Sequence, residues 1–118
     1  DAGAVWTVRE PERLWHDAPP KYVGLSEAVM RGCGRAVTER DCLTCHLFDV
    51  RERLDEVGVP ALALVGAHDE LTPPAYHEYR ADGIPAGELA ELPDAAHLAM
   101  LEAPAAFNEA LSAFLSRL

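Results

Sequence analysis

The sequence predicts an α/β fold, and three observations support this prediction. A continuous apolar run without a charge covers residues 59–66, VPALALVG, which is typical of a strand buried on both faces of a parallel sheet. A second, more exposed strand candidate covers residues 87–92, GELAEL. A helical pattern follows each strand, so the order from residue 59 onward is βαβα. We therefore expect about two parallel strands with flanking helices, preceded by a helical segment.

The chain divides at about residue 48 into two predicted regions. Residues 1–48 are predicted to be irregular and helical, because proline interrupts residues 9–24 and helical spacing follows. Within this region, residues 1–8 have the pattern of a short strand. Residues 49–118 contain the βαβα unit. A hydrophobic content of 49% over 118 residues fits one domain or a part of one, and it argues against extensive disorder.

Two helices are predicted before residue 48. Ser26 has the residue type that caps a helix, and Gly34 is expected to end the helix that follows. Thr38 is expected to begin the second helix, in which Leu43 and Leu47 stand four positions apart on one face. These helices form the N-terminal helical segment of the predicted fold.

Three further helices are predicted in residues 49–118. Asp49 is expected to cap a helix that Gly58 ends, and Thr72 to cap a helix that Gly83 ends. Pro104 suits the first turn of the final helix. The final helix carries an amphipathic stripe of Phe107, Leu111, Phe114, Leu115 and Leu118. Together with the second strand, this helix completes the predicted βαβα unit.

Charge and hydropathy argue against several classes of function. The formal net charge of −10 disfavours a nucleic-acid groove, which needs lysine and arginine to neutralise phosphates. The longest apolar run, residues 58–67, is too short to cross a bilayer, and residues 1–3 do not begin a signal peptide. Three cysteines cannot all pair within the chain, which favours a reducing compartment. We expect a cytoplasmic protein without nucleic-acid or membrane partners.

Cys42, Cys45 and His46 have the C-x-x-C-H spacing by which c-type haem is attached. Haem attachment normally requires export, and a thioredoxin-like C-x-x-C follows a strand, whereas this one lies in a helical pattern. Zinc bound by these residues and Cys33 is disfavoured, because adjacent Cys45 and His46 rarely both reach one tetrahedral ion. We predict no metal and no cofactor. Instead, Cys42, Leu43 and Cys45 are expected to pack a helix against the core.

Acidic and histidine side chains follow both predicted strands. His68, Asp69 and Glu70 come directly after the first strand, and Asp94 and His97 follow the second. The carboxyl ends of neighbouring parallel strands meet at one edge of the sheet, so we expect these side chains to lie together. A carboxylate and a histidine in this arrangement are the orienting acid and the general base of a nucleophile–His–acid triad. The alternative, a turn-capping aspartate and a solvated histidine, remains open from the spacing alone.

Two longer motifs extend this pattern. The first loop reads G-x-x-D-x-x-T-P, and the second contains a histidine followed by E-x-P-x-x-F. The residues that form the motifs are Gly66, Asp69, Thr72, Pro73, His97, Glu102, Pro104 and Phe107. Over residues 45–118 the chain resembles the C-terminal part of an α/β-hydrolase, and residues 1–48 then resemble a remnant of its helical cap. The resemblance implies that Asp69 is the triad acid and His97 the base, although residues 94–96, DAA, replace the usual glycines before the histidine.

The nucleophile of this family lies on a G-x-S-x-G elbow between a strand and a helix. Residues 24–28, GLSEA, come nearest to that pattern, which makes Ser26 the candidate nucleophile within this chain. No apolar strand precedes Ser26, and its 43-position distance from Asp69 is too short for the elements that normally intervene. The nucleophile is therefore expected outside this chain, and its residue type stays open.

The resemblance implies an esterase-like hydrolase that acts on a small-molecule substrate. In this interpretation the chain supplies the acid and the base, and it is inactive alone because no activated nucleophile is present. The missing N-terminal part of the hydrolase, or self-association, is expected to cover the exposed edge of the first strand. A non-catalytic, hydrolase-like interaction module is the alternative function.

Overall fold

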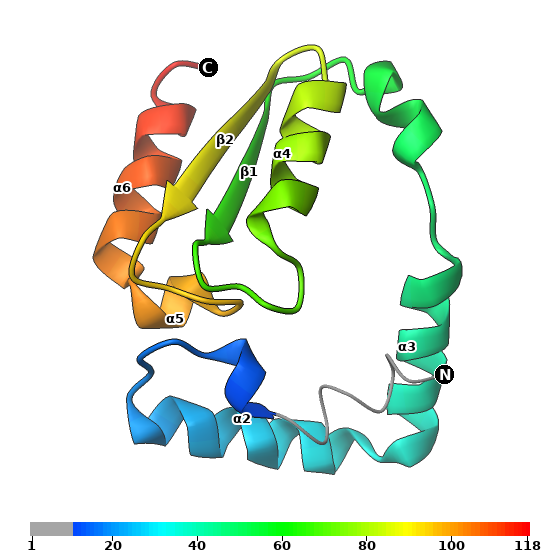
Figure 1. Cartoon of the computed structure of the whole chain (residues 1–118), viewed down its shortest axis with the longest axis vertical. Coiled ribbons are helices and arrows are strands. Elements are labelled where there is room, and N and C mark those ends of the chain that lie inside the picture. Colours follow the sequence, from blue (N-terminus) through cyan, green and yellow to red (C-terminus); the bar gives the residue numbers. More distant parts are fainter. Residues whose placement is uncertain (1–10) are drawn as a thin grey trace.

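The structure is a computed structural model that describes residues 11–118, apart from the side chains of Pro11, Glu12 and Met30. The strand predicted at residues 1–8 lies outside the described residues. In chain order the described elements are η1 (Pro11–Leu14), α2 (Pro20–Cys33), α3 (Arg35–Leu47), η2 (Arg51–Glu56), β1 (Ala61–Gly66), α4 (Pro74–Gly83), β2 (Gly87–Leu92), α5 (Ala99–Glu102) and α6 (Pro104–Leu115). Figure 1 shows the strands, α4 and α6 close together, with α2 and α3 farther from the sheet.

The two strands form a parallel sheet, which confirms the predicted α/β class. Their register runs from Ala61 opposite Gly87 to Gly66 opposite Leu92. Helix α4 connects the strands and packs against both, and α6 also contacts both; Figure 1 shows these helices on opposite sides of the strands. The prediction of a strand at residues 87–92 is confirmed. The first strand begins two residues later than predicted, after Pro60, which has no N–H to donate to a strand partner.

The buried core lies at the carboxyl end of the sheet. Leu92, Ala95 and Ala99 form a buried cluster. The partly buried residues packed against this cluster are Leu64, Ala103 and Phe107. Small alanines allow the loop after β2 to pack directly on the strand ends, so the loop is part of the core rather than a mobile surface segment.

One edge of β1 has no strand beside it in the part of the chain that the structure describes. Val65 and Gly66 are buried, whereas the four residues before them are only half-buried. The predicted burial on both faces is therefore wrong for most of this strand. A groove of about 300 Å³ lies between β1 and α4, and its lining is formed by Ala61, Leu62, Ala63, Leu64, His77, Arg80, Ala81 and Ile84.

The helices before residue 48 begin earlier than the sequence suggested. Helix α2 begins at Pro20, so Ser26 lies inside it and the prediction that Ser26 caps the helix is wrong. The Ser26 hydroxyl instead donates a 2.8 Å hydrogen bond to the Val23 carbonyl. Gly34 separates α2 from α3 with a φ of 75°, a backbone conformation that favours glycine. Because this turn already starts α3 at Arg35, Thr38 lies within the helix.

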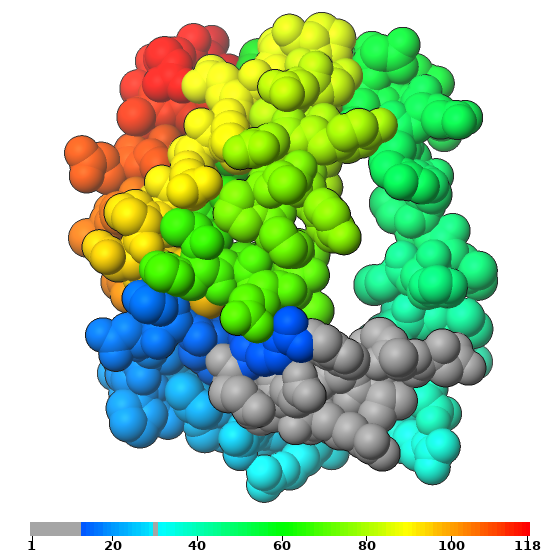
Figure 2. Space-filling view, viewed as in Figure 1, coloured from blue at the N-terminus to red at the C-terminus, as the bar shows by residue number. Residues whose placement is uncertain are grey.

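Helix α3 does not pack against the core. None of its residues is buried, and Leu43 and Leu47 are 55% and 71% exposed. The expectation that Cys42, Leu43 and Cys45 pack this helix onto the core is therefore wrong. Figure 2 shows open space between the teal surface of α3 and the yellow-green surface of α4. No helix among the described residues combines the length and apolar character needed to cross a membrane.

The remaining helices differ from prediction in detail. The segment after Asp49 forms the short 3-10 helix η2 rather than an α-helix, and Asp49 accepts a 3.0 Å hydrogen bond from the Arg51 backbone N–H. Helix α4 begins at Pro74, after Thr72, because the Thr72 hydroxyl bonds to Asp69 instead of capping the helix. In α6 the predicted stripe is buried at Phe114, whereas Leu118 lies past the helix end and is exposed.

Gly66 lies where the loops after β1 and β2 meet, and its replacement by alanine is expected to destabilise the fold. A Cβ at Gly66 would lie closer than van der Waals contact to the backbone oxygens of Ala95 and Ala96, which cannot rotate away. We expect Gly66→Ala to lower the free energy of unfolding in urea by about 1–3 kcal/mol. Gly24→Ala is the matched control, because its Cβ position has no described atom within 4 Å apart from its chain neighbours and the backbone of its own helix. Equal stability of the two variants would contradict the prediction.

Candidate active site

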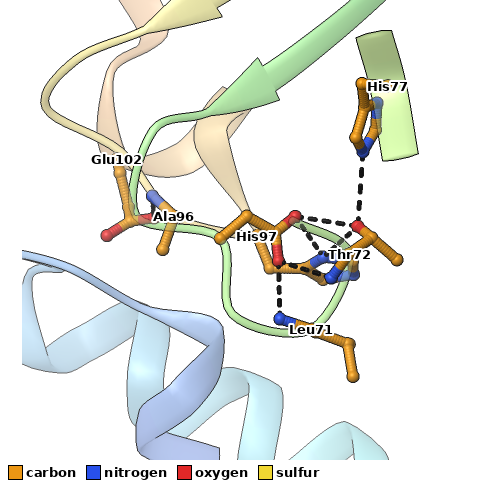
Figure 3. Close-up of polar contacts among 7 residues, drawn as sticks. Leu71, Thr72, His77, Ala96, His97 and Glu102 are labelled. Atoms are coloured by element: carbon orange, nitrogen blue, oxygen red, sulfur yellow. Dashed lines mark hydrogen bonds and ion pairs between the residues drawn. The ribbon is translucent and has the colours of Figure 1, made fainter. Parts of the chain in front are cut away.

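Asp69 is held in the loop after β1 by four hydrogen bonds. Its side chain is 4% exposed. The backbone N–H groups of Leu71 and Thr72 each donate to Asp69 Oδ1 at 2.9 Å, and the Thr72 hydroxyl donates to Oδ2 at 2.9 Å. Figure 3 shows these bonds, together with a bond from His97. An aspartate that folds its own loop in this way forms an Asx-type turn, so the loop fixes the carboxylate orientation.

His97 reaches Asp69 from the loop after β2. Its Nδ1 lies 2.9 Å from Asp69 Oδ2, although the residues are 28 positions apart. The two loops meet because β1 and β2 are parallel neighbours, as the sequence predicted for residues after these strands. The His97 side chain is 31% exposed, so the pair is buried on the Asp69 side and partly open on the imidazole side.

The electrostatics of the pair fix the histidine tautomer. Burial acts to raise the pKa of Asp69, but hydrogen bonds from Thr72 and His97 outweigh it and hold that pKa below its usual value. An ionised carboxylate only accepts hydrogen bonds. His97 Nδ1 therefore carries the proton that bonds to Asp69, and Nε2 of the neutral ring keeps a lone pair that can accept a proton.

Thr72 joins a second histidine to this pair. Its Oγ1 lies 3.4 Å from His97 Nδ1 and 3.4 Å from Nε2 of His77, as Figure 3 shows. Burial first, and then the charge of Arg80, lower the pKa of His77. His77 was not predicted from the sequence, since a histidine five residues after Thr72 on a helix belongs to no recognised motif. Only the folded loop brings it to the threonine.

Comparisons with known proteins identify the fold. The chain is 35% identical over 101 residues to 3-oxoadipate enol-lactonase 2 of Acinetobacter baylyi, a match that covers 86% of this chain and 37% of that protein. The structure of a thermophilic esterase has a TM-score of 0.75 at 35% identity and covers 90% of this chain and 43% of its own. The enol-lactonase structure from Burkholderia xenovorans LB400 has a TM-score of 0.76 at 26% identity and covers 96% and 40%.

No protein-family model matches the chain. The similar proteins nevertheless cover nearly all of this chain, whereas the chain spans only about 40% of their length. The chain has the fold of the C-terminal portion of an α/β-hydrolase. This α/β-hydrolase portion contains the two strands and the two loops that carry Asp69 and His97.

Other predicted candidates lie near the pair or apart from it. His68 stacks on His16, with ring centroids 3.6 Å apart, and Glu70 forms a 2.9 Å ion pair with Arg13. Asp94 is exposed. Ser26 lies within α2, where its hydroxyl bonds to the helix backbone. Within the described part of this α/β-hydrolase portion, no hydrogen bond joins Ser26 to Asp69 or His97.

The C-x-x-C-H segment lies on the exposed helix α3 of this α/β-hydrolase portion. Cys33, Cys42 and Cys45 are not joined by a disulfide. In the described residues no group of three or more His, Cys, Asp or Glu side chains is arranged to hold a metal ion. The spacing is explained by a helix that presents these residues at its surface.

An open hollow of about 770 Å³ lies beside the acid loop. Its lining consists of Arg13, Trp15, His16, Ala67, His68, Asp69, Glu70, Pro73 and Pro74. The Trp15 indole N–H is buried without a hydrogen-bond partner in the described part of the chain. Since Asp69 rather than His97 lines it, the hollow adjoins the Asp69 side of the pair and not the exposed side of the His97 ring.

The depressed pKa of Asp69 predicts acid-sensitive folding. The carboxyl of an unfolded aspartate has a pKa of about 3.9, and that of folded Asp69 is lower. The resulting stability is present above about pH 4 and is lost as the pH falls through the folded pKa. We expect the urea unfolding free energy to fall more steeply between about pH 5 and pH 2 in the wild type than in Asp69→Asn. Asp94→Asn is the control, and parallel curves for wild type and Asp69→Asn would refute the linkage.

Proposed function

We propose that this chain supplies the acid and the general base of an esterase-like hydrolase with a nucleophile–His–acid mechanism. Asp69 is the acid and His97 the base. The observation that carries the proposal is the 2.9 Å contact between His97 Nδ1 and a buried carboxylate that three further hydrogen bonds orient. If Asp69 only capped its turn and His97 were only solvated, no contact between them would be expected. Instead, the Asp69 carboxylate bonds both to the N–H groups of the turn and to the His97 imidazole.

Asp69 and His97 have different roles in the proposed mechanism. Asp69 holds the ring with Nδ1 protonated, so Nε2 takes the proton of the attacking nucleophile and the imidazolium is stabilised by the carboxylate. Nε2 then returns the proton to the leaving oxygen of the substrate. The partial exposure of His97 leaves its side chain accessible to a nucleophile and a substrate.

The nucleophile is proposed to come from outside this chain. Ser26 is bonded within α2, and the chain spans about 40% of the length of the proteins it matches. The edge of β1 without a strand neighbour and its groove beside α4 offer a surface for the N-terminal part of the hydrolase. Self-association through this edge is the competing proposal. Whether the N-terminal part or a second copy covers the edge of β1, the chain alone lacks an activated nucleophile and is expected to be inactive.

The proposed substrate is a small molecule with an ester-type bond. One similar structure is called an esterase and two similar proteins are called enol-lactonases, and a lactone is a cyclic ester. Fold alone does not select a substrate, so the proposal extends only to the bond that is broken.

A reconstitution experiment tests the proposed function. This chain is combined with the upstream part of its own polypeptide, and hydrolysis of p-nitrophenyl acetate is measured for each part and for the complex. We expect neither part to exceed the background rate and the complex to be active. A complex that assembles without hydrolysing p-nitrophenyl esters of any acyl length would instead favour a non-catalytic interaction module.

A further inference from the structure

Glu102 accepts three backbone hydrogen bonds from two segments that are distant in sequence. It is the last residue of α5. Its Oε2 accepts from the Ala96 N–H at 2.8 Å, and its Oε1 accepts from the N–H groups of His16 at 2.5 Å and Asp17 at 3.0 Å. Figure 3 shows the bond to Ala96, beside His97. Glu102 thus contacts the loop of the general base and the segment that precedes α2.

The bond from the Ala96 N–H to Glu102 is one of two hydrogen bonds that hold a single peptide group in place. The carbonyl of Ala95 accepts a 3.0 Å hydrogen bond from the His68 N–H, and the N–H of the same peptide group donates to Glu102. Ala95 and Ala96 are 0% and 1% exposed. The peptide group that joins Ala95 and Ala96, one residue before His97, is therefore held between the loop after β1 and Glu102. This explains how a loop without glycines keeps the histidine in place.

The second set of bonds holds a strap, which we define as residues 13–17. Besides the two bonds to Glu102, the strap accepts a 3.4 Å bond at the Leu14 carbonyl from the Leu98 N–H. The His16 ring stacks on His68 in the acid loop. The strap leads to α2, which Figure 1 shows lying beyond the arrowheads of β1 and β2. The same glutamate therefore anchors the approach to α2.

We propose that Glu102 is a positioning residue that couples the strap to the loop of His97. The inference rests on the proposed function of His97 as the base. Among the described residues, every hydrogen bond to the Glu102 carboxylate comes from a backbone N–H, so the position requires an acceptor at both oxygens. A glutamine would turn an NH₂ group toward one set of donors. The placement of His97 and the attachment of α2 thus depend on one carboxylate.

Hydrogen exchange tests the coupling in this chain without any need for hydrolysis. We expect Glu102→Ala to speed amide exchange at His16, Asp17 and Ala96 by roughly 10- to 100-fold, since hydrogen bonds to charged groups resist local opening. Glu102→Gln is expected to deprotect only one of the two sides, because it keeps one oxygen. Glu109→Ala, at an exposed glutamate on α6, is the control. Unchanged exchange at these amides in Glu102→Ala would overturn the proposal.

A second readout separates positioning from simple destabilisation. In the reconstituted hydrolase we expect Glu102→Ala to lower kcat by up to about 10²-fold with little change in KM, because the base is misplaced. In the NMR spectrum of the chain, the His97 Nδ1–H resonance should shift or broaden in Glu102→Ala and remain as in wild type in Glu109→Ala. A normal resonance with a normal kcat would overturn the positioning role. Loss of the proposed hydrolase function itself would leave the exchange result standing, so the two failures are distinguishable.

Discussion

Replacing His97 by alanine is expected to lower kcat/KM for ester hydrolysis by about 10⁴- to 10⁶-fold in the reconstituted hydrolase. The imidazole Nε2 is the proposed proton acceptor, and no other described histidine forms a hydrogen bond to the Asp69 carboxylate. The loss should appear in kcat rather than in KM, because the base acts in the transition state and not in substrate binding. Steady-state kinetics with p-nitrophenyl acetate measure both parameters.

The matched control for this prediction is His46→Ala. His46 is an exposed histidine on α3, so its loss removes an imidazole without touching the site. We expect this variant to retain wild-type kinetics. If His97→Ala retains activity within tenfold of the wild type while the complex is assembled, His97 is not the general base.

Asp69→Asn is expected to lower kcat by about 10⁴-fold through the wrong histidine tautomer. The N–H groups of Leu71 and Thr72 both donate to Oδ1, so they hold the amide oxygen of the asparagine at that position. The NH₂ group must then occupy the position of Oδ2 and donate to His97 Nδ1. His97 would carry its proton on Nε2 and would no longer accept one from the nucleophile.

Nitrogen-15 NMR of the imidazole rings checks this mechanism directly in the isolated chain. The wild type should show His97 protonated on Nδ1 near neutral pH, and Asp69→Asn should show it protonated on Nε2. Asp94→Asn, at an exposed aspartate of the same loop as His97, should leave the tautomer and kcat unchanged. An Nδ1-protonated ring in Asp69→Asn would show that the turn does not orient the side chain as proposed.

The sheet and the Asp69–His97 contact were predictable because each depends on short sequence patterns. An uncharged apolar run predicted β1, a second strand candidate predicted β2, and parallel pairing then brought the two loops together. The spacing alone left a turn-capping aspartate and a solvated histidine open. The longer motifs of the two loops, through their resemblance to α/β-hydrolases, favoured the pair.

The N-terminal helices and the contacts around the pair were harder to predict. Ser26 has a capping residue type, but Pro20 already starts α2, so the local preference of serine does not decide where the helix begins. Helix α3 has apolar residues, but none of its residues is buried against the rest of the described chain. Glu102 was visible as part of a motif, but its bonds to residues 16 and 17 join segments about 85 positions apart. No pattern within a short stretch of sequence predicts a hydrogen bond between residues so far apart.

Asp69 and His97 are 28 positions apart in the sequence, and only α4 and β2 lie between them. Contacts over such a short separation close early during folding, and loop-closure entropy rises only slowly with length, by about 0.6 kcal/mol for each doubling. The Asp69–His97 pair is therefore expected to form while this chain folds, independently of the proposed nucleophile. Hydrolytic activity would then appear with the second-order kinetics of two folded parts that meet, and its onset would depend on their concentrations.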